Sequence, residues 1–313
     1  MFIVSIVCPI CSGRDNREVE RHHEYILRHC RTCDVVYADP MKTSESFYSA
    51  DYDYMLRDRL IMDPVRWDFR WDIGEFLRTP PRRDGNLLDI GCGTGFFVKR
   101  AREMGFRGYG IEFNERSVQR GKDFFALDTL YPLDIDGLTR KFPELKFQVV
   151  TLFQVLEHVE NPRDLFSAIG RIITEDAVVV VALPLRGRWP DTSGKTGDYP
   201  PHHLTRWSLK ALENFLDRHG FFIRRHKFEN FPLQNMPALL YPYLLERARF
   251  LTMKGSRTDD SLRDVSEEQA ITILTKRKVK MQIATAASFP LWLFLKALGA
   301  RGPHLYVEAC LKP

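Results

Sequence analysis

The first residues that could do chemistry form a glycine-rich loop, LLDIGCGTGFF, at residues 87–97. Its glycines stand at alternate positions, Gly91, Gly93 and Gly95. Glycines let a backbone approach a ligand closely where a strand of an open sheet gives way to a helix. A dinucleotide site would have its third glycine where Phe96 stands, and no Gly-Lys-Ser/Thr sequence follows. The loop therefore disfavours phosphate binding.

Two carboxylates indicate which ligand this loop would take. Asp89 would repel a pyrophosphate, but it can accept a hydrogen bond from an ammonium group, directly or through water. Glu112 ends the next predicted strand, where acids of nucleotide-binding folds accept the hydroxyls of a ribose. A ligand that has a ribose and an ammonium group but no phosphate is S-adenosylmethionine.

Four cysteines near the start of the sequence form a second chemical pattern. Cys8 and Cys11 make one Cys-x-x-Cys pair, and Cys30 and Cys33 make another. This spacing is typical of the two knuckles of one tetrahedral zinc site, whereas surface thiols or a redox pair are the alternatives. We expect a structural Zn²⁺ in a ribbon at residues 1–40, which is too short to have a core of its own.

Three histidines are candidates for acid–base catalysis. His158 lies in LEHVENP, just after a predicted strand, and His202 and His203 lie in YPPHHLTRWS after the next one. A histidine with a pKa near neutral is the favoured base if an acceptor must lose a proton. Each also has a structural alternative, since His158 could brace a helix start and His203 could support the helix that Ser208 caps.

Alternating strands and helices must position these residues. NLLDIG, GYGIEF, KFQVVTLF, AVVVVALP and FFIRRHKF are predicted strands. Gly105 is a predicted helix end, and Asn114 and Ser208 are predicted helix caps. Repeated units of this length predict a doubly wound α/β domain, with helices on both faces of a parallel sheet.

The domain limits follow from these patterns. We expect an S-adenosylmethionine-binding α/β domain at residues 86–229, preceded by a helical lead-in at 41–85. A helical insertion or lid at 230–303 would come before the last strand of the sheet at 304–313.

Composition and charge exclude few classes of protein. The chain has 313 residues, with 44% hydrophobic and 28% charged residues, as in ordinary globular proteins. Its net charge of +5 is too weak to predict nucleic-acid binding. The opening MFIVSIV lacks the basic start of a signal peptide, so we expect a cytoplasmic protein. The apolar and basic residues of 236–300 also suggest peripheral membrane contact.

Three motifs together resemble those of class I S-adenosylmethionine-dependent methyltransferases. LLDIGCGTGFF, YGIEFN and VLEHVENP are similar to the branch of quinone-precursor O-methyltransferases and of many small-molecule and sugar methyltransferases. The resemblance covers about residues 86–229 and implies a Rossmann-like sheet. The cofactor-binding residues that it implies, together with the loop and strand-end positions beside them, are Asp89, Gly91, Cys92, Gly93, Gly95, Phe96, Glu112, Phe113, Asp134, Phe153 and Gln154. Asp128 and Asp136 are alternatives to Asp134 near the adenine.

The resemblance also bears on metal use at the active site. Quinone-precursor enzymes of that branch hold a divalent metal with an acidic and histidine set. Glu157 and His158 match that set, but Gln154 stands where another carboxylate is found. A structural role for His158 is therefore the stronger expectation.

The acceptor is the remaining question. We expect a small-molecule, glycan or lipid-linked acceptor that is methylated at oxygen with a histidine base, although nitrogen and carbon stay open. One rival is a zinc-fingered RNA base methyltransferase, a class of enzyme that has this domain order. Enzymes that methylate exocyclic amines of bases carry an Asn/Asp-Pro-Pro-aromatic motif where this chain has FQVLEHV. A nucleic-acid acceptor is therefore disfavoured. The other rival is a non-catalytic methyltransferase-like binding protein, which the intact Asp89 and Glu112 disfavour.

Overall fold

The computed structural model of the chain describes residues 6–43, 70–187, 199–231, 233, 236 and 285–313. The chain divides into two compact units. The first comprises residues 1–187, 193–229 and 304–313, and the second comprises 188–192 and 230–303. Much of the predicted lead-in at 41–85, and most of the predicted insertion at 230–303, lie outside the described residues.

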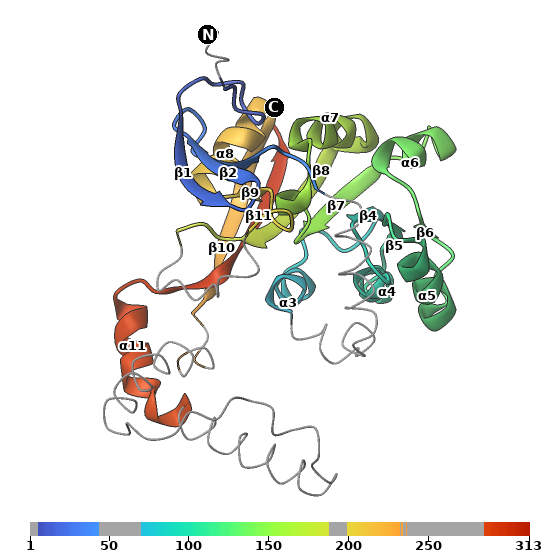
Figure 1. The fold of residues 1–313 in the computed structure, drawn as a ribbon. Coiled ribbons are helices and arrows are strands. Elements are labelled where there is room, and N and C mark those ends of the chain that lie inside the picture. The colour runs from blue at the N-terminus through green and yellow to red at the C-terminus, as the bar shows by residue number, and fades with distance from the viewer. Residues whose placement is uncertain (1–5, 44–69, 188–198, 232, 234–235, 237–284) are drawn as a thin grey trace, which may run out of the picture. The chain divides into compact units, whose positions relative to one another are not determined.

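A seven-stranded sheet forms the centre of the first unit, in the order β10-β11-β8-β7-β4-β5-β6 (Figure 1). Its strands are β4 (Asn86–Ile90), β5 (Arg107–Ile111), β6 (Leu130–Tyr131), β7 (Phe147–Phe153), β8 (Ile173–Pro184), β10 (Phe221–Asn230) and β11 (Arg301–Leu311). The neighbours from β8 to β6 all pair in parallel. β11 runs antiparallel to β8, with Leu305 opposite Leu183.

Helices cover both faces of this sheet, as Figure 1 shows. They are α3 (Trp71–Arg78), α4 (Phe96–Glu103), α5 (Glu115–Phe125), α6 (Ile135–Lys141), α7 (Pro162–Ile172) and α8 (Leu209–Arg218). On one face Phe76 of α3 and Phe97 of α4 join a buried cluster with Val149 of β7. On the other, α6, α7 and α8 contribute to a second cluster, which includes Phe166 and Phe215. The predicted doubly wound α/β fold is confirmed.

Local sequence signals set several helix ends. The side chain of Asn114 accepts from the Ser117 N–H at the start of α5, and Ser208 accepts from the Ala211 N–H at the start of α8. Both predicted caps are present. The sequence did not predict β6 or α6, and Asp134 caps α6 by accepting from the Gly137 N–H at 2.6 Å.

A second, four-stranded sheet carries the cysteines and has the order β1-β2-β3-β9. Its strands are β1 (Asn16–His22), β2 (Tyr25–Cys30), β3 (Val36–Asp39) and β9 (Thr205–Arg206). β9 pairs antiparallel with β3, with Val36 opposite Arg206. Tyr37 of β3 is buried in the same cluster as Trp207. The ribbon predicted at residues 1–40 is therefore completed, in both its sheet and its core, by residues from beyond position 200.

The second unit contributes helix α11 (Phe289–Ala297) to the described residues. The indole of Trp292 donates to the Phe231 carbonyl at 2.7 Å, and both residues belong to a small apolar cluster with Ala300. The large apolar side chains that this segment exposes are Phe289, Leu291, Leu293, Phe294 and Leu298. Among the described helices, none has the length and apolar character needed to cross a membrane.

Candidate functional site

The glycine loop joins β4 to α4, and its glycines all have positive φ: 69° at Gly91, 54° at Gly93 and 77° at Gly95. A Cβ atom on Gly91 would lie 2.6 Å from the Val155 side chain. A Cβ on Gly95 would lie equally close to Leu130. At Gly93 such an atom would have no neighbour within 4 Å, so this glycine faces open space. The backbone at Gly93 is therefore one part of the loop that a ligand can approach.

Glu112 follows β5 and lies beside this open glycine. One carboxylate oxygen accepts from the Gly93 N–H and the other from the Asn114 N–H, both at 3.1 Å. The side chain is buried, with 9% of its surface exposed. A carboxylate has about four lone-pair sites, so these two bonds leave capacity for two hydroxyls. The structure thus brings Glu112 and the glycine loop together as the sequence predicted.

Asp89 lies in β4 and is buried inside the sheet. It accepts a hydrogen bond of 2.6 Å from the Thr151 hydroxyl. Burial raises the pKa of Asp89 to about 7, although the Thr151 bond and Arg70 oppose the shift. A carboxyl group in this state would gain from a cation placed beside it.

Asp72 is a residue of this site that the sequence analysis missed. It lies at the start of α3 and accepts from Arg70 and, at 3.2 Å, from the Gln154 side-chain amide. Burial would raise the pKa of Asp72, but Arg70 and the Ile73 N–H bring it below its usual range. The available signal was an acid in the first turn of the helix that precedes β4.

Several residues that the resemblance assigned to the cofactor have other surroundings. Phe153 packs against Phe97, with ring centroids 4.8 Å apart, so its side chain belongs to the core. Phe96 and Cys92 are also buried, and the Cys92 N–H donates to the Ile111 carbonyl. Phe113, beside Glu112, is 83% exposed. The capping role of Asp134 accounts for that residue without a ligand, so its contact with adenine stays a prediction.

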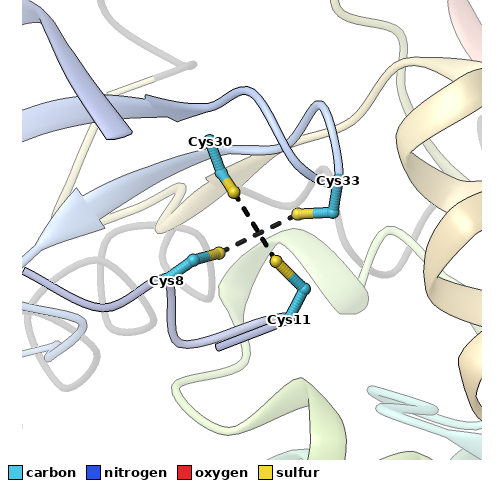
Figure 2. Close-up of side chains that lie close together, drawn as sticks. All are labelled: Cys8, Cys11, Cys30 and Cys33. Atoms are coloured by element: carbon cyan, nitrogen blue, oxygen red, sulfur yellow. Dashed lines mark hydrogen bonds between the residues drawn. The ribbon is translucent and has the colours of Figure 1, made fainter. Parts of the chain in front are cut away.

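The four predicted metal-binding cysteines lie together, as Figure 2 shows. Sulfur atoms are 3.8 Å apart for Cys8 and Cys33, and 3.5 Å apart for Cys11 and Cys30. A tetrahedral zinc with Zn–S bonds of about 2.3 Å places its sulfurs about 3.8 Å apart. Burial raises the pKa of Cys11 to about 11, so a bound cation must displace thiol protons at neutral pH.

The three candidate histidines also meet. Their ligand atoms lie within 4.8 Å of one another, and the rings of His202 and His203 are stacked with centroids 4.7 Å apart. His158 ends the 3₁₀-helix η2 (Leu156–His158) and is 2.6 Å through its Nδ1 from the His202 carbonyl oxygen. Burial and the two neighbouring imidazoles lower the pKa of His158 to about 3.

This histidine cluster lies at the same edge of the sheet as the glycine loop. Val155, the residue that faces Gly91, directly precedes η2. The Leu204 N–H donates to the Glu157 carbonyl at 2.8 Å, which holds the segment after His203 against η2. A ligand on the loop and an acceptor near the histidines would therefore be neighbours.

A family model described as a methyltransferase domain matches residues 66–229, about half of the chain. The chain belongs to this methyltransferase family. Together with the fold, this confirms the resemblance to class I S-adenosylmethionine-dependent methyltransferases. The match begins before the predicted start at residue 86, so it includes α3 and Asp72.

Curated relatives of this methyltransferase have low identity. A ubiquinone biosynthesis O-methyltransferase of Yersinia enterocolitica is 28% identical over 130 residues, which cover 36% of this chain and 53% of that one. An uncharacterized methyltransferase of Mycobacterium tuberculosis is 28% identical over 134 residues, covering 41% and 61%. The chain thus spans about half the length of the curated relatives that it matches.

Solved structures are similar at lower identity still. A methyltransferase from Archaeoglobus fulgidus, described as SAM-dependent, has a TM-score of 0.46 and 17% identity, with coverage of 83% of this chain and 100% of that one. A phosphoethanolamine N-methyltransferase from Haemonchus contortus has a TM-score of 0.45 and 18% identity, with coverage of 78% and 53%.

Proposed function

We propose that this methyltransferase moves the methyl group of S-adenosylmethionine to an oxygen of a small-molecule, glycan or lipid-linked acceptor. The observation that carries the choice of donor is the open face of Gly93 beside the buried Glu112 carboxylate. Glu112 would accept the ribose hydroxyls, and the loop backbone would approach the methionine part. Asp89, whose pKa burial raises to about 7, would be ionised by the ammonium group.

The choice of oxygen and of a histidine base rests on two observations. Two relatives named as ubiquinone biosynthesis O-methyltransferases are each 28% identical to the segments they match. The histidine cluster lies next to the loop, but a pKa near 3 makes His158 a poor base, which leaves His202 or His203. The acceptor oxygen would bond to the methyl carbon while the carbon–sulfur bond breaks. S-adenosylhomocysteine would leave, and the hydroxyl proton would pass to the histidine.

The cysteine cluster is proposed as a structural zinc site. Four sulfurs at the spacing of a tetrahedral site support this assignment, and none of the four thiols is exposed. The ion would belong to the ribbon, where it would hold the two cysteine pairs together.

A membrane-side acceptor is supported by α11. This helix exposes large apolar side chains beside Lys296, a surface that contact with lipid would cover. The rest of the proposed contact region, 237–284, lies outside the described residues. Co-sedimentation with anionic vesicles measures this contact. If the proposal holds, part of the protein should pellet with the vesicles, whereas protein that stays in the supernatant would contradict it. A cytoplasmic location stays a prediction from the sequence.

Calorimetry with S-adenosylmethionine and S-adenosylhomocysteine tests the donor site directly. We expect the wild type to bind both ligands. Glu112→Ala should lose at least tenfold in affinity, because the carboxylate that accepts from the two ribose hydroxyls is removed. Glu115→Ala is the matched control, since this acid lies three residues further along in the first turn of α5. Equal affinity of the two variants would contradict the ribose role, and no binding by the wild type would refute the function.

A further inference from the structure

The described residues hold two groups of side chains with metal-ligand chemistry: the cysteines, and His158 with His202 and His203. The three histidines come from two segments more than 40 residues apart in sequence. Their ring centroids are 4.6 Å apart for His158 and His202, and 4.8 Å apart for His158 and His203. Three imidazoles converge here on one small volume at the edge of the sheet.

The hydrogen bond of His158 fixes which nitrogen is available to a ligand. A carbonyl oxygen can only accept, so the contact with the His202 carbonyl requires the hydrogen on Nδ1. Nε2 then presents its lone pair. Metal-binding histidines show this same arrangement, in which one ring N–H donates to a carbonyl and orients the other nitrogen toward the ion.

Glu157 adds negative charge at that nitrogen. Its side chain is 1% exposed, and one carboxylate oxygen lies 3.8 Å from His158 Nε2. A cation close to both atoms would be attracted by each of them. A metal ion bound by the three rings would lie near this carboxylate.

We propose that His158, His202 and His203 together bind a divalent transition-metal ion, with the Glu157 carboxylate offsetting part of its charge. Imidazole nitrogens suit zinc, cobalt, nickel, copper and iron better than magnesium. Three protein ligands also leave a fourth position open, as in catalytic rather than structural zinc sites. Ligand nitrogens in such a site are about 3.4 Å apart, so the cluster would contract slightly on binding.

This ligand set differs from the acidic and histidine set that the resemblance implies. Gln154, which replaces a carboxylate of that set, donates its amide to Asp72 and is engaged in a different part of the site. His202 and His203 instead supply donors from the segment before β9.

The open position suggests a role for the ion in methyl transfer. This role rests on the proposed function. The ion would supply Lewis-acid chemistry there and would make a nearby acceptor hydroxyl more acidic. The proton would leave to water, and the oxygen would then attack the methyl carbon. In that state the histidines act as ligands, and the ion takes over the role assigned above to a histidine base.

Cobalt titration of the full chain, with zinc already bound at the cysteines, tests this site without any acceptor. We expect one equivalent of Co²⁺ with visible bands but no thiolate-to-cobalt charge transfer, while the zinc content stays at one per chain. His202→Gln with His203→Gln should weaken cobalt binding more than tenfold, whereas His226→Gln, on β10, should leave it unchanged. A third variant, His158→Gln, should behave like the double variant.

The outcomes separate this inference from the proposed function. Wild-type chain that binds S-adenosylmethionine but no cobalt beyond the cysteine site would overturn the inference and leave the function standing. Cobalt that binds the histidine variants as tightly as the wild type would also overturn it. Should the variants lose zinc and unfold, the wild-type titration still decides, because it needs no substitution.

Discussion

The carboxyl group of Asp89 lies inside the sheet, where burial opposes its negative charge and raises its pKa to about 7. Arg70 favours its ionised form, while Glu112 and Asp72 disfavour it. In the unfolded chain the pKa would be about 3.9, so the native state binds more protons between roughly pH 4 and 7. This group therefore lowers stability as the pH rises through that window, by at most about 1.4 kcal/mol per pH unit.

The first prediction concerns this slope. Asp89→Asn should remove the decline in the free energy of unfolding between pH 4 and 7, as measured by urea denaturation at several pH values. Wild-type affinity for S-adenosylmethionine should rise from pH 6 to pH 8, because the ammonium binds the ionised carboxyl. Asp123→Asn, an exposed change on α5, is the control, and an identical slope in the Asp89 and Asp123 variants would contradict the argument.

A second prediction compares two glycines of the loop. Gly93→Ala should lower the free energy of unfolding by about 1–2 kcal/mol, the cost of a left-handed residue. It should weaken cofactor binding more than tenfold, since its methyl group would point into the open space beside Glu112. Gly91→Ala adds a clash with Val155 and should be clearly less stable. Urea denaturation and calorimetry measure both quantities, and tight binding by Gly93→Ala would be inconsistent with the proposed site.

At the scale of elements, the ribbon and the histidine segment share a sheet. The Leu204 carbonyl accepts from the Ala38 N–H at 2.8 Å, and the Leu204 N–H donates to η2. The Asp34 carboxylate, next to Cys33, also accepts from Ser208 and Arg186. The cysteine site thus helps to position residues 199–206, although it lies outside the glycine-loop domain in sequence.

Metal removal should reveal this coupling. After chelation of the metal proposed at the cysteines, hydrogen exchange should speed up at residues 25–39 and also at 199–206, because β9 would lose its partner strand. Exchange in β4 and β5 should stay slow and serves as the internal control. Unchanged protection at 199–206, with 25–39 exposed, would show that the two segments are independent.

The elements differ in how far the sequence could predict them. β4 and β7 are apolar runs with clear limits, so they were predictable, whereas β8 begins at Ile173, four residues before its predicted start. β6 and β9 have two residues each and exist because a neighbouring strand pairs with them, which leaves no local signal. In the site, the spacing of Asp89 and Glu112 was informative. The sequence could not predict that His158 meets His203, because this contact depends on backbone hydrogen bonds made by Leu204.

At the scale of the whole molecule, removal of residues 1–40 should do more than delete a metal site. Leu204 and Trp207 are fully buried, and both pack in clusters that contain ribbon residues. A chain starting at residue 41 should give less soluble protein and a lower midpoint of thermal unfolding. Full-length Val19→Ser, an exposed change in β1, should match the wild type. If the shortened chain were as soluble as the wild type and unfolded at the same temperature, this would contradict the shared core.

The position of β11 between β8 and β10 has a consequence for synthesis. Residues 231–300 separate β10 from β11 in sequence, so at about 5–20 residues per second the ribosome needs several seconds to make them. During that delay β8, with its run of valines, presents an unpaired apolar edge to solvent or to a chaperone. The nascent chain is therefore most exposed to misassembly after most of its sheet has already been made.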